Sequence, residues 1–111
     1  MTDFAPTLKQ LSALAQETRL LAFRALMEAG PEGLAAGAIA RLLQVAPNKL
    51  SGHMTILVNS GLVTVERAGR KMIYRAEIES VNELLSVLVE NCCQGRPEIC
   101  EGLSSLSALK C

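Results

Sequence analysis

Apolar residues recur every three or four positions in the first part of the chain, which is the period of an amphipathic helix. The positions with this spacing are Leu8, Leu11, Ala15, Leu20, Phe23 and Met27. They form two stripes and therefore predict two helices. The second helix should end at Gly30-Pro31, because glycine adopts the left-handed conformation that follows a helix and proline cannot continue one.

Two further helical stripes follow, separated by a connection of about four residues. Their apolar positions are Ile39, Leu42, Leu43, Leu50, Met54, Leu57 and Val58. The first helix should end near Gln44. The second should begin at Pro47, which suits the first helical position, and end at Gly61.

After Gly61 the apolar period changes from 3.6 to two, as in a strand. Residues 62–67 and 70–75 are rich in strand-forming side chains and flank Ala68-Gly69. This pattern predicts a β-hairpin with its tip at Ala68-Gly69.

A long helix is predicted from Ile78, because its apolar positions alternate spacings of three and four as in a coiled-coil seam. The seam consists of Ile78, Val81, Leu85, Leu88 and Cys92, widened by Leu84 and Val87. The stretch 94–97 contains Gly and Pro and should end the helix. We therefore expect one domain over residues 1–93 and a thiol-bearing C-terminal segment over residues 94–111.

The predicted element order is α-α-α-α-β-β-α, a mainly α fold with a β-hairpin wing. A short helix, a tight turn, a second helix and a hairpin are the order of a winged helix-turn-helix, whose second helix enters the DNA major groove. Stepping 100° per residue from the buried stripe places Asn48, Lys49, Gly52, Thr55 and Asn59 on the outward face and Ser51 and His53 at the edges of the stripe, and the candidate DNA contacts come from both sets. These candidates are Asn48, Lys49, Ser51, Gly52, His53 and Thr55 on the helix, and Arg67, Arg70 and Lys71 at the wing tip.

Two of these helix positions have alternative interpretations. Gly52 costs about 1 kcal/mol relative to Ala in a helix interior. It is either a tolerated flaw or a site where the duplex or a neighbouring helix approaches closely. His53, like Ser51, lies at the edge of the stripe and is either a phosphate contact or a boundary residue with a partner inside the protein.

The net charge of the 111 residues is zero, which argues at first against a nucleic-acid binder. The charges are unevenly distributed, however. Residues 41–75 contain six basic residues and one acidic residue, while residues 76–111 contain two basic and six acidic ones. The middle of the chain is therefore the part expected to face a polyanion.

No apolar run approaches the ~18 residues of a membrane span, so we expect no membrane association. No secretory leader is visible either, which favours the cytoplasm and cysteines that are thiols or ligands. A phosphate-loop thiol enzyme needs an Arg six positions after its Cys, and Cys92 and Cys93 are followed there by Glu98 and Ile99. Catalysis is not expected.

Cys92, Cys93 and Cys100 can converge because Gly95 and Pro97 allow the chain to turn back. Three soft thiolates suit a pyramidal centre such as trivalent arsenic (arsenite) or antimony (antimonite). Zinc fits less well, since structural zinc takes four ligands and the chain's single His lies on the predicted recognition helix. A bridge between Cys93 and Cys100 is also feasible, so a thiol redox or persulfide switch stays open. Cys111 is interpreted as an uninvolved thiol.

The sequence resembles the ArsR/SmtB family of small bacterial repressors over roughly residues 8–93. The matching pieces are Leu14-Ala15-Gln16-Glu17-Thr18-Arg19-Leu20, Leu50-Ser51-Gly52-His53-Met54, Gly61-Leu62-Val63 and the wing Arg67-Ala68-Gly69-Arg70-Lys71-Met72-Ile73-Tyr74. The resemblance implies a homodimer formed by the first and last helices, which binds a double-stranded inverted-repeat operator and leaves it when an inducer binds.

Within the family, arsenic sensors with cysteines at the start of the recognition helix are not matched, because residues 40–50 contain none. The adjacent Cys92 and Cys93, with Cys100 beyond them, are similar to a subgroup that senses trivalent arsenic at the C-terminal end. The expected function is a transcriptional repressor released from DNA by arsenite.

Overall fold

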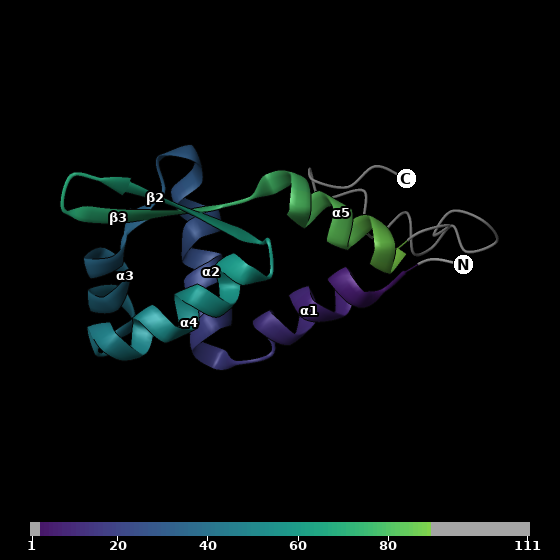
Figure 1. Ribbon diagram of the computed structural model, residues 1–111, viewed down its shortest axis with the longest axis horizontal. Coiled ribbons are helices and arrows are strands. Elements are labelled where there is room, and N and C mark those ends of the chain that lie inside the picture. Colours follow the sequence, from purple (N-terminus) through teal and green to yellow (C-terminus); the bar gives the residue numbers. More distant parts are fainter. Residues whose placement is uncertain (1–2, 90–111) are drawn as a thin grey trace. The chain divides into compact units, whose positions relative to one another are not determined.

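The computed structural model describes residues 3–89. Their elements in chain order are α1 (Ala5–Leu14), α2 (Glu17–Ala29), a 3-10 turn η1 (Gly30–Glu32), β1 (Leu34–Ala35), α3 (Ala36–Leu43), α4 (Pro47–Asn59), β2 (Val63–Ala68), β3 (Lys71–Ala76) and α5 (Ile78–Val89) (Figure 1). The chain forms two compact units, one that ends at Glu77 and one that begins at Ile78. The winged helix-turn-helix is confirmed and lies within the first unit. The expected boundary between residues 93 and 94 lies outside the described residues and stays a prediction.

The helix ends follow the local chemistry of the sequence. The side chain of Gln16 caps α2 by accepting a hydrogen bond from the backbone N–H of Arg19 (2.9 Å). Gly30 ends α2 with φ +72°, and Gly61 follows α4 with φ +88°. Pro47 lies in the first turn of α4, where its missing N–H is not needed. The predicted end of α2 at Gly30 and the predicted start and end of α4 at Pro47 and Gly61 are confirmed.

Helix α2 is central to the first unit, contacting α1, α3, α4 and β3. The largest side chains that are fully buried in the described residues are Leu26, Ile39, Leu50, Met54, Leu57, Leu62 and Val63. Ala22 and Leu26 of α2 have no exposed surface, while Leu20 and Met27 are exposed. Part of the apolar stripe of α2 is therefore buried in the core and part of it is exposed. On α1 the buried face does not follow the predicted apolar stripe. Leu8 and Leu11 are exposed, whereas Thr7 and Ala13 are buried.

The sheet has three antiparallel strands in the order β1-β3-β2. Ala68 pairs with Lys71, so the two loop residues are Gly69 and Arg70. The predicted tip, Ala68-Gly69, is wrong by one residue. Two-residue hairpin loops favour types I′ and II′, and type II′ fits here because Gly69 has φ +65° while the φ of Arg70 is not positive. The shift places Arg70 in the loop itself and Ala68 in the strand.

Strand β1 was not predicted. Its two residues pair with β3, Leu34 with Tyr74 and Ala35 with Ile73. Gly33 precedes β1 with φ +70°, and a Cβ at this residue would collide with the carbonyl oxygen of Tyr74. This close approach allows only glycine.

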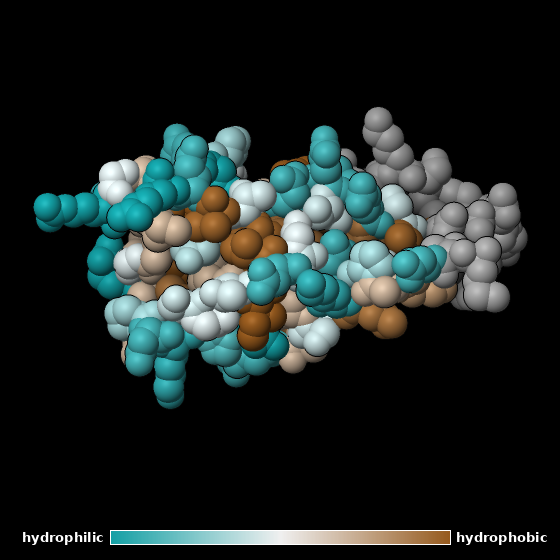
Figure 2. Space-filling model, in the orientation of Figure 1, coloured by the Kyte–Doolittle hydropathy of each residue, from teal (hydrophilic) through white to brown (hydrophobic). Residues whose placement is uncertain are grey.

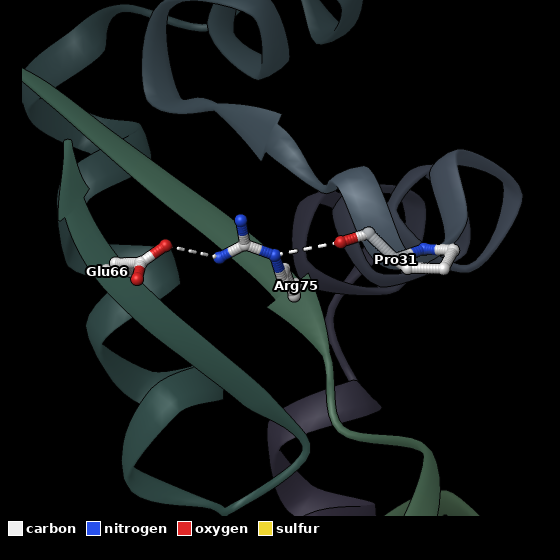
Figure 3. Close-up of polar contacts among 3 residues, drawn as sticks. All are labelled: Pro31, Glu66 and Arg75. Carbon is white, nitrogen blue, oxygen red and sulfur yellow. Dashed lines mark hydrogen bonds and ion pairs between the residues drawn. The ribbon is translucent and has the colours of Figure 1, made fainter.

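Arg75 of β3 contacts both η1 and β2 (Figure 3). Its Nε donates to the carbonyl oxygen of Pro31 (2.9 Å), and its Nη1 donates to Oε1 of Glu66 (3.0 Å). Arg75 therefore joins η1 to β2, and its charge is matched by the single acidic residue of the segment 41–75.

Substituting Gly33 with Ala is expected to destabilise the fold by about 2–6 kcal/mol, from backbone strain of about 1–3 kcal/mol plus about 1–3 kcal/mol for the clash with β3. Gly30→Ala is the matched control, since Gly30 has nearly the same φ (+72°) and nothing within 4 Å of an added Cβ. It is expected to lose only the strain. Urea unfolding of both variants measures the difference, and equal losses would contradict the clash.

Candidate nucleic-acid interface

Helix α4 presents most of its predicted contact residues to solvent. Leu50, Met54 and Leu57 are at most 1% exposed, and they anchor one face of the helix in the core. The opposite face is exposed and contains Asn48, Lys49, Ser51, Gly52, Thr55 and Asn59. The arrangement expected from the helical period is confirmed, whereas the contacts of these residues with DNA stay a prediction.

Two polar side chains of this face have partners within α4. Oδ1 of Asn48 accepts a hydrogen bond from the backbone N–H of Lys49 (3.0 Å). The hydroxyl of Thr55 donates to the carbonyl oxygen of Ser51 (2.9 Å), so Thr55 offers lone pairs to a ligand. The face therefore contains both acceptors and donors, as base recognition in the major groove requires.

Gly52 lies in the middle of α4, and a Cβ added there would meet nothing within 4 Å among the described residues. Close packing against a neighbouring helix of this part of the chain is thus not the reason for the glycine. Close approach of the duplex and a tolerated flaw both stay open.

His53 differs from the other candidates because it is half-buried and touches α2. Its Nδ1 lies 3.3 Å from Nη1 of Arg19. The same guanidinium donates through Nε to the carbonyl oxygen of Ala13 in the last turn of α1 (2.6 Å). Sequence reasoning missed Arg19. Arg19 belongs to the family-matching piece Leu14-Ala15-Gln16-Glu17-Thr18-Arg19-Leu20, but nothing in the sequence links it to His53.

The wing supplies the second group of candidates. Arg67, Arg70 and Lys71 are exposed and gather around the hairpin tip, where Nε of Arg67 donates to the carbonyl oxygen of Gly69 (3.3 Å). In Figure 2 hydrophilic side chains cover the projecting end of the wing. An open cleft of about 310 Å³ separates α4 from the wing. It is lined by Ser51, Thr55, Val58, Asn59, Val65, Met72 and Tyr74. Helix and wing therefore border one continuous surface.

The predicted ligands Cys92, Cys93 and Cys100 lie outside the described residues. Within residues 3–89, no group of three or more His, Cys, Asp or Glu side chains gathers in a way that could hold a metal ion. In the same part of the chain, none of the helices has the length and apolar character needed to cross a membrane.

An exposed polar recognition helix beside a basic wing defines a winged helix-turn-helix DNA-binding domain. Comparisons with known proteins agree, since a family model described as a helix-turn-helix domain matches residues 14–66. Among solved structures, NolR from Sinorhizobium fredii is 30% identical with a TM-score of 0.60, and the match covers 77% of this chain and 82% of NolR. A search of curated proteins finds no match.

Two further structures extend the comparison. The ArsR-like transcriptional regulator from Rhodococcus sp. RHA1 is 23% identical with a TM-score of 0.70, covering 96% of this chain and 97% of the other. The homodimeric winged helix-turn-helix DNA-binding domain of a possible ArsR-family regulator from Mycobacterium bovis is 25% identical with a TM-score of 0.62, covering 76% of each chain. The chain belongs to the ArsR family of transcriptional regulators. The ArsR-like and ArsR-family structures that it matches are described as transcriptional regulators.

Replacing Arg70 or Lys71 with Ala is expected to weaken binding to any duplex and to reduce its salt dependence. Removing one phosphate contact lowers the slope of log K against log salt by about 0.9. Arg24→Ala is the control, because Arg24 is exposed on α2 beside Leu42 and Leu43 of α3 and its substitution removes the same charge. Fluorescence anisotropy over a salt series measures the slopes. Equal slopes for all three variants would contradict a wing contact.

Proposed function

We propose that this regulator is a homodimeric repressor that binds double-stranded operator DNA through α4 and the wing, and that trivalent arsenic or antimony releases it. The observation that carries the DNA-binding part is the single surface formed by the exposed face of α4 and the cations Arg67, Arg70 and Lys71. Asn48, Lys49, Ser51, Gly52 and Thr55 would lie in the major groove, and the wing tip would contact the backbone.

The homodimer is supported by apolar side chains on α1 and on α5 that are exposed among the described residues. Phe4, Leu8 and Leu11 along α1 are 50%, 62% and 37% exposed. On α5, Ile78 and Leu88 are exposed as well. Helices with exposed apolar stripes are typical of subunit interfaces. The related domain from Mycobacterium bovis is described as homodimeric.

The inducer part is supported by the donor set in the sequence. Cys92, Cys93 and Cys100 supply three thiols within nine residues, and arsenic and antimony in the trivalent state bind thiolates preferentially. Binding by these residues would change the preferred spacing of the two DNA-binding units in the dimer. The operator accepts one half-site spacing, so a ligand that favours another spacing lowers the affinity for DNA.

Titration of the reduced protein with an operator selected from random duplexes tests the proposal. We expect tight binding in the absence of arsenite and about hundredfold weaker binding at saturation, which corresponds to a coupling free energy of about 2.7 kcal/mol. Retention of DNA at saturating arsenite would remove the inducer from the proposal. If no duplex sequence is selected, the proposal that the protein is an operator-binding repressor is wrong.

A thiol redox or persulfide switch is the second candidate, favoured by the spacing of Cys93 and Cys100 around Gly95 and Pro97. Peptide mass spectrometry after mild oxidation distinguishes the two candidates. A bridge between Cys93 and Cys100 that accompanies loss of DNA binding supports the redox switch, and its absence counts against it.

A further inference from the structure

The side chains of Arg19 and His53 join α2 to α4 through a polar contact of 3.3 Å. The chemistry of this contact selects one tautomer of the neutral imidazole. A guanidinium has only N–H donors and is always charged. Nδ1 of His53 must therefore accept the hydrogen bond from Nη1 of Arg19. In the neutral ring the proton then resides on Nε2, which makes Nε2–H a donor at the opposite side of the ring.

Arg19 is itself held in place. Its Nε donates to the carbonyl oxygen of Ala13, one of the carbonyls that the end of α1 leaves without a helical partner. Its backbone N–H donates to the side chain of Gln16. The first bond positions the guanidinium and the second holds the backbone of Arg19 at the start of α2, so His53 meets a positioned donor.

The flank of α4 that contains His53 faces away from the wing. Ser51, Thr55 and Val58 line the cleft beside the wing. At 100° per residue, Lys49 and His53 lie on the opposite flank, one turn apart. Lys49 is exposed and His53 half-exposed, so both reach solvent there.

A helix in the major groove lies between two sugar-phosphate backbones. With the wing beside one backbone, as in the proposed function, the flank with Lys49 and His53 would face the other. We propose that Lys49, His53 and Arg19 form a phosphate-binding edge, in which Nε2–H of His53 donates to a backbone phosphate and Arg19 positions the ring. The inference rests on the proposed DNA binding and adds a second line of phosphate contacts on the side opposite the wing.

The variant His53→Asn separates this role from a purely internal contact. Asn keeps an acceptor near the position of Nδ1, so the bond to Arg19 is retained, but it has no donor at the position of Nε2. With a mixed-sequence duplex, we expect binding about tenfold weaker than that of the wild type, since a hydrogen bond to a charged group is removed. The salt slope should not change, because no charge is removed. Lys49→Ala, by contrast, should lower the slope by about 0.9, the value for one phosphate contact.

His53 is the chain's single histidine, so its ring nitrogens give one unambiguous set of NMR signals. In the DNA-free protein we expect the Nε2–H tautomer, and in Arg19→Met we expect a mixture of tautomers with weaker DNA binding. If Arg19→Met fails to fold, the tautomer of His53 in the wild type and the DNA affinity of His53→Asn still test the inference. An Nδ1–H tautomer, or wild-type affinity of His53→Asn, would overturn the inference. Absence of duplex binding by the wild type would instead overturn the proposed function.

Discussion

Arsenite no longer releases DNA from a Cys92→Ser or Cys93→Ser variant, if the thiols of these residues hold the inducer as proposed. A serine hydroxyl is not a soft ligand, so the site loses one of three donors and most of its affinity for trivalent arsenic. The coupling of about 2.7 kcal/mol expected for the wild type then falls to nearly zero. Operator binding with and without saturating arsenite, measured by anisotropy, gives both values for each variant.

Cys111→Ser is the matched control, because Cys111 is the one thiol interpreted as uninvolved. It is expected to respond like the wild type. All variants should bind the operator with unchanged affinity when arsenite is absent, since none alters α4 or the wing. A full response in Cys92→Ser and Cys93→Ser would rule out the proposed ligands.

Glutamate in place of Leu8 is expected to dissociate the dimer and thereby abolish tight operator binding. Burying a leucine contributes about 1.5–3 kcal/mol, and a two-fold interface contains each substitution twice. The loss of at least about 3 kcal/mol weakens the dimer about hundredfold or more. Sedimentation equilibrium measures the dimer dissociation constant, and circular dichroism checks that the monomer remains folded, as expected for a residue that is 62% exposed.

Leu42→Glu provides the comparison for this variant. Leu42 is 63% exposed, nearly the same as Leu8, and lies on α3 instead of α1. The same change of size and charge there should leave the dimer intact. If both variants dissociate the dimer equally, or neither does, then α1 does not form the interface.

The helices and the wing were predictable from the sequence because their signals are local. Each helix of the first unit has an apolar stripe of its own, and Gly30, Pro47 and Gly61 mark helix ends through their backbone preferences. The hairpin tip was misplaced by one residue because Ala68-Gly69 and Gly69-Arg70 both contain the glycine that the turn needs. The pairing of Ala68 with Lys71 decides between them.

The features that escaped prediction depend on contacts between distant parts of the chain. Strand β1 has two residues, too few to show a period, and exists because β3 pairs with it. The contact between Arg19 and His53 joins residues 34 positions apart. The sequence also did not predict which apolar side chains are exposed. Leu8 and Leu26 are equally apolar, but Leu8 is exposed and Leu26 is buried.

Strand β1 has a mechanical consequence. Ala35 pairs with Ile73 of the wing, and α3 begins at the next residue, Ala36. Without a linker between them, the base of the wing and the first helix of the helix-turn-helix cannot rotate independently. The base of the wing and α3 therefore move as one body, and in the proposed dimer an inducer would act by changing the spacing of two such bodies instead of bending either one.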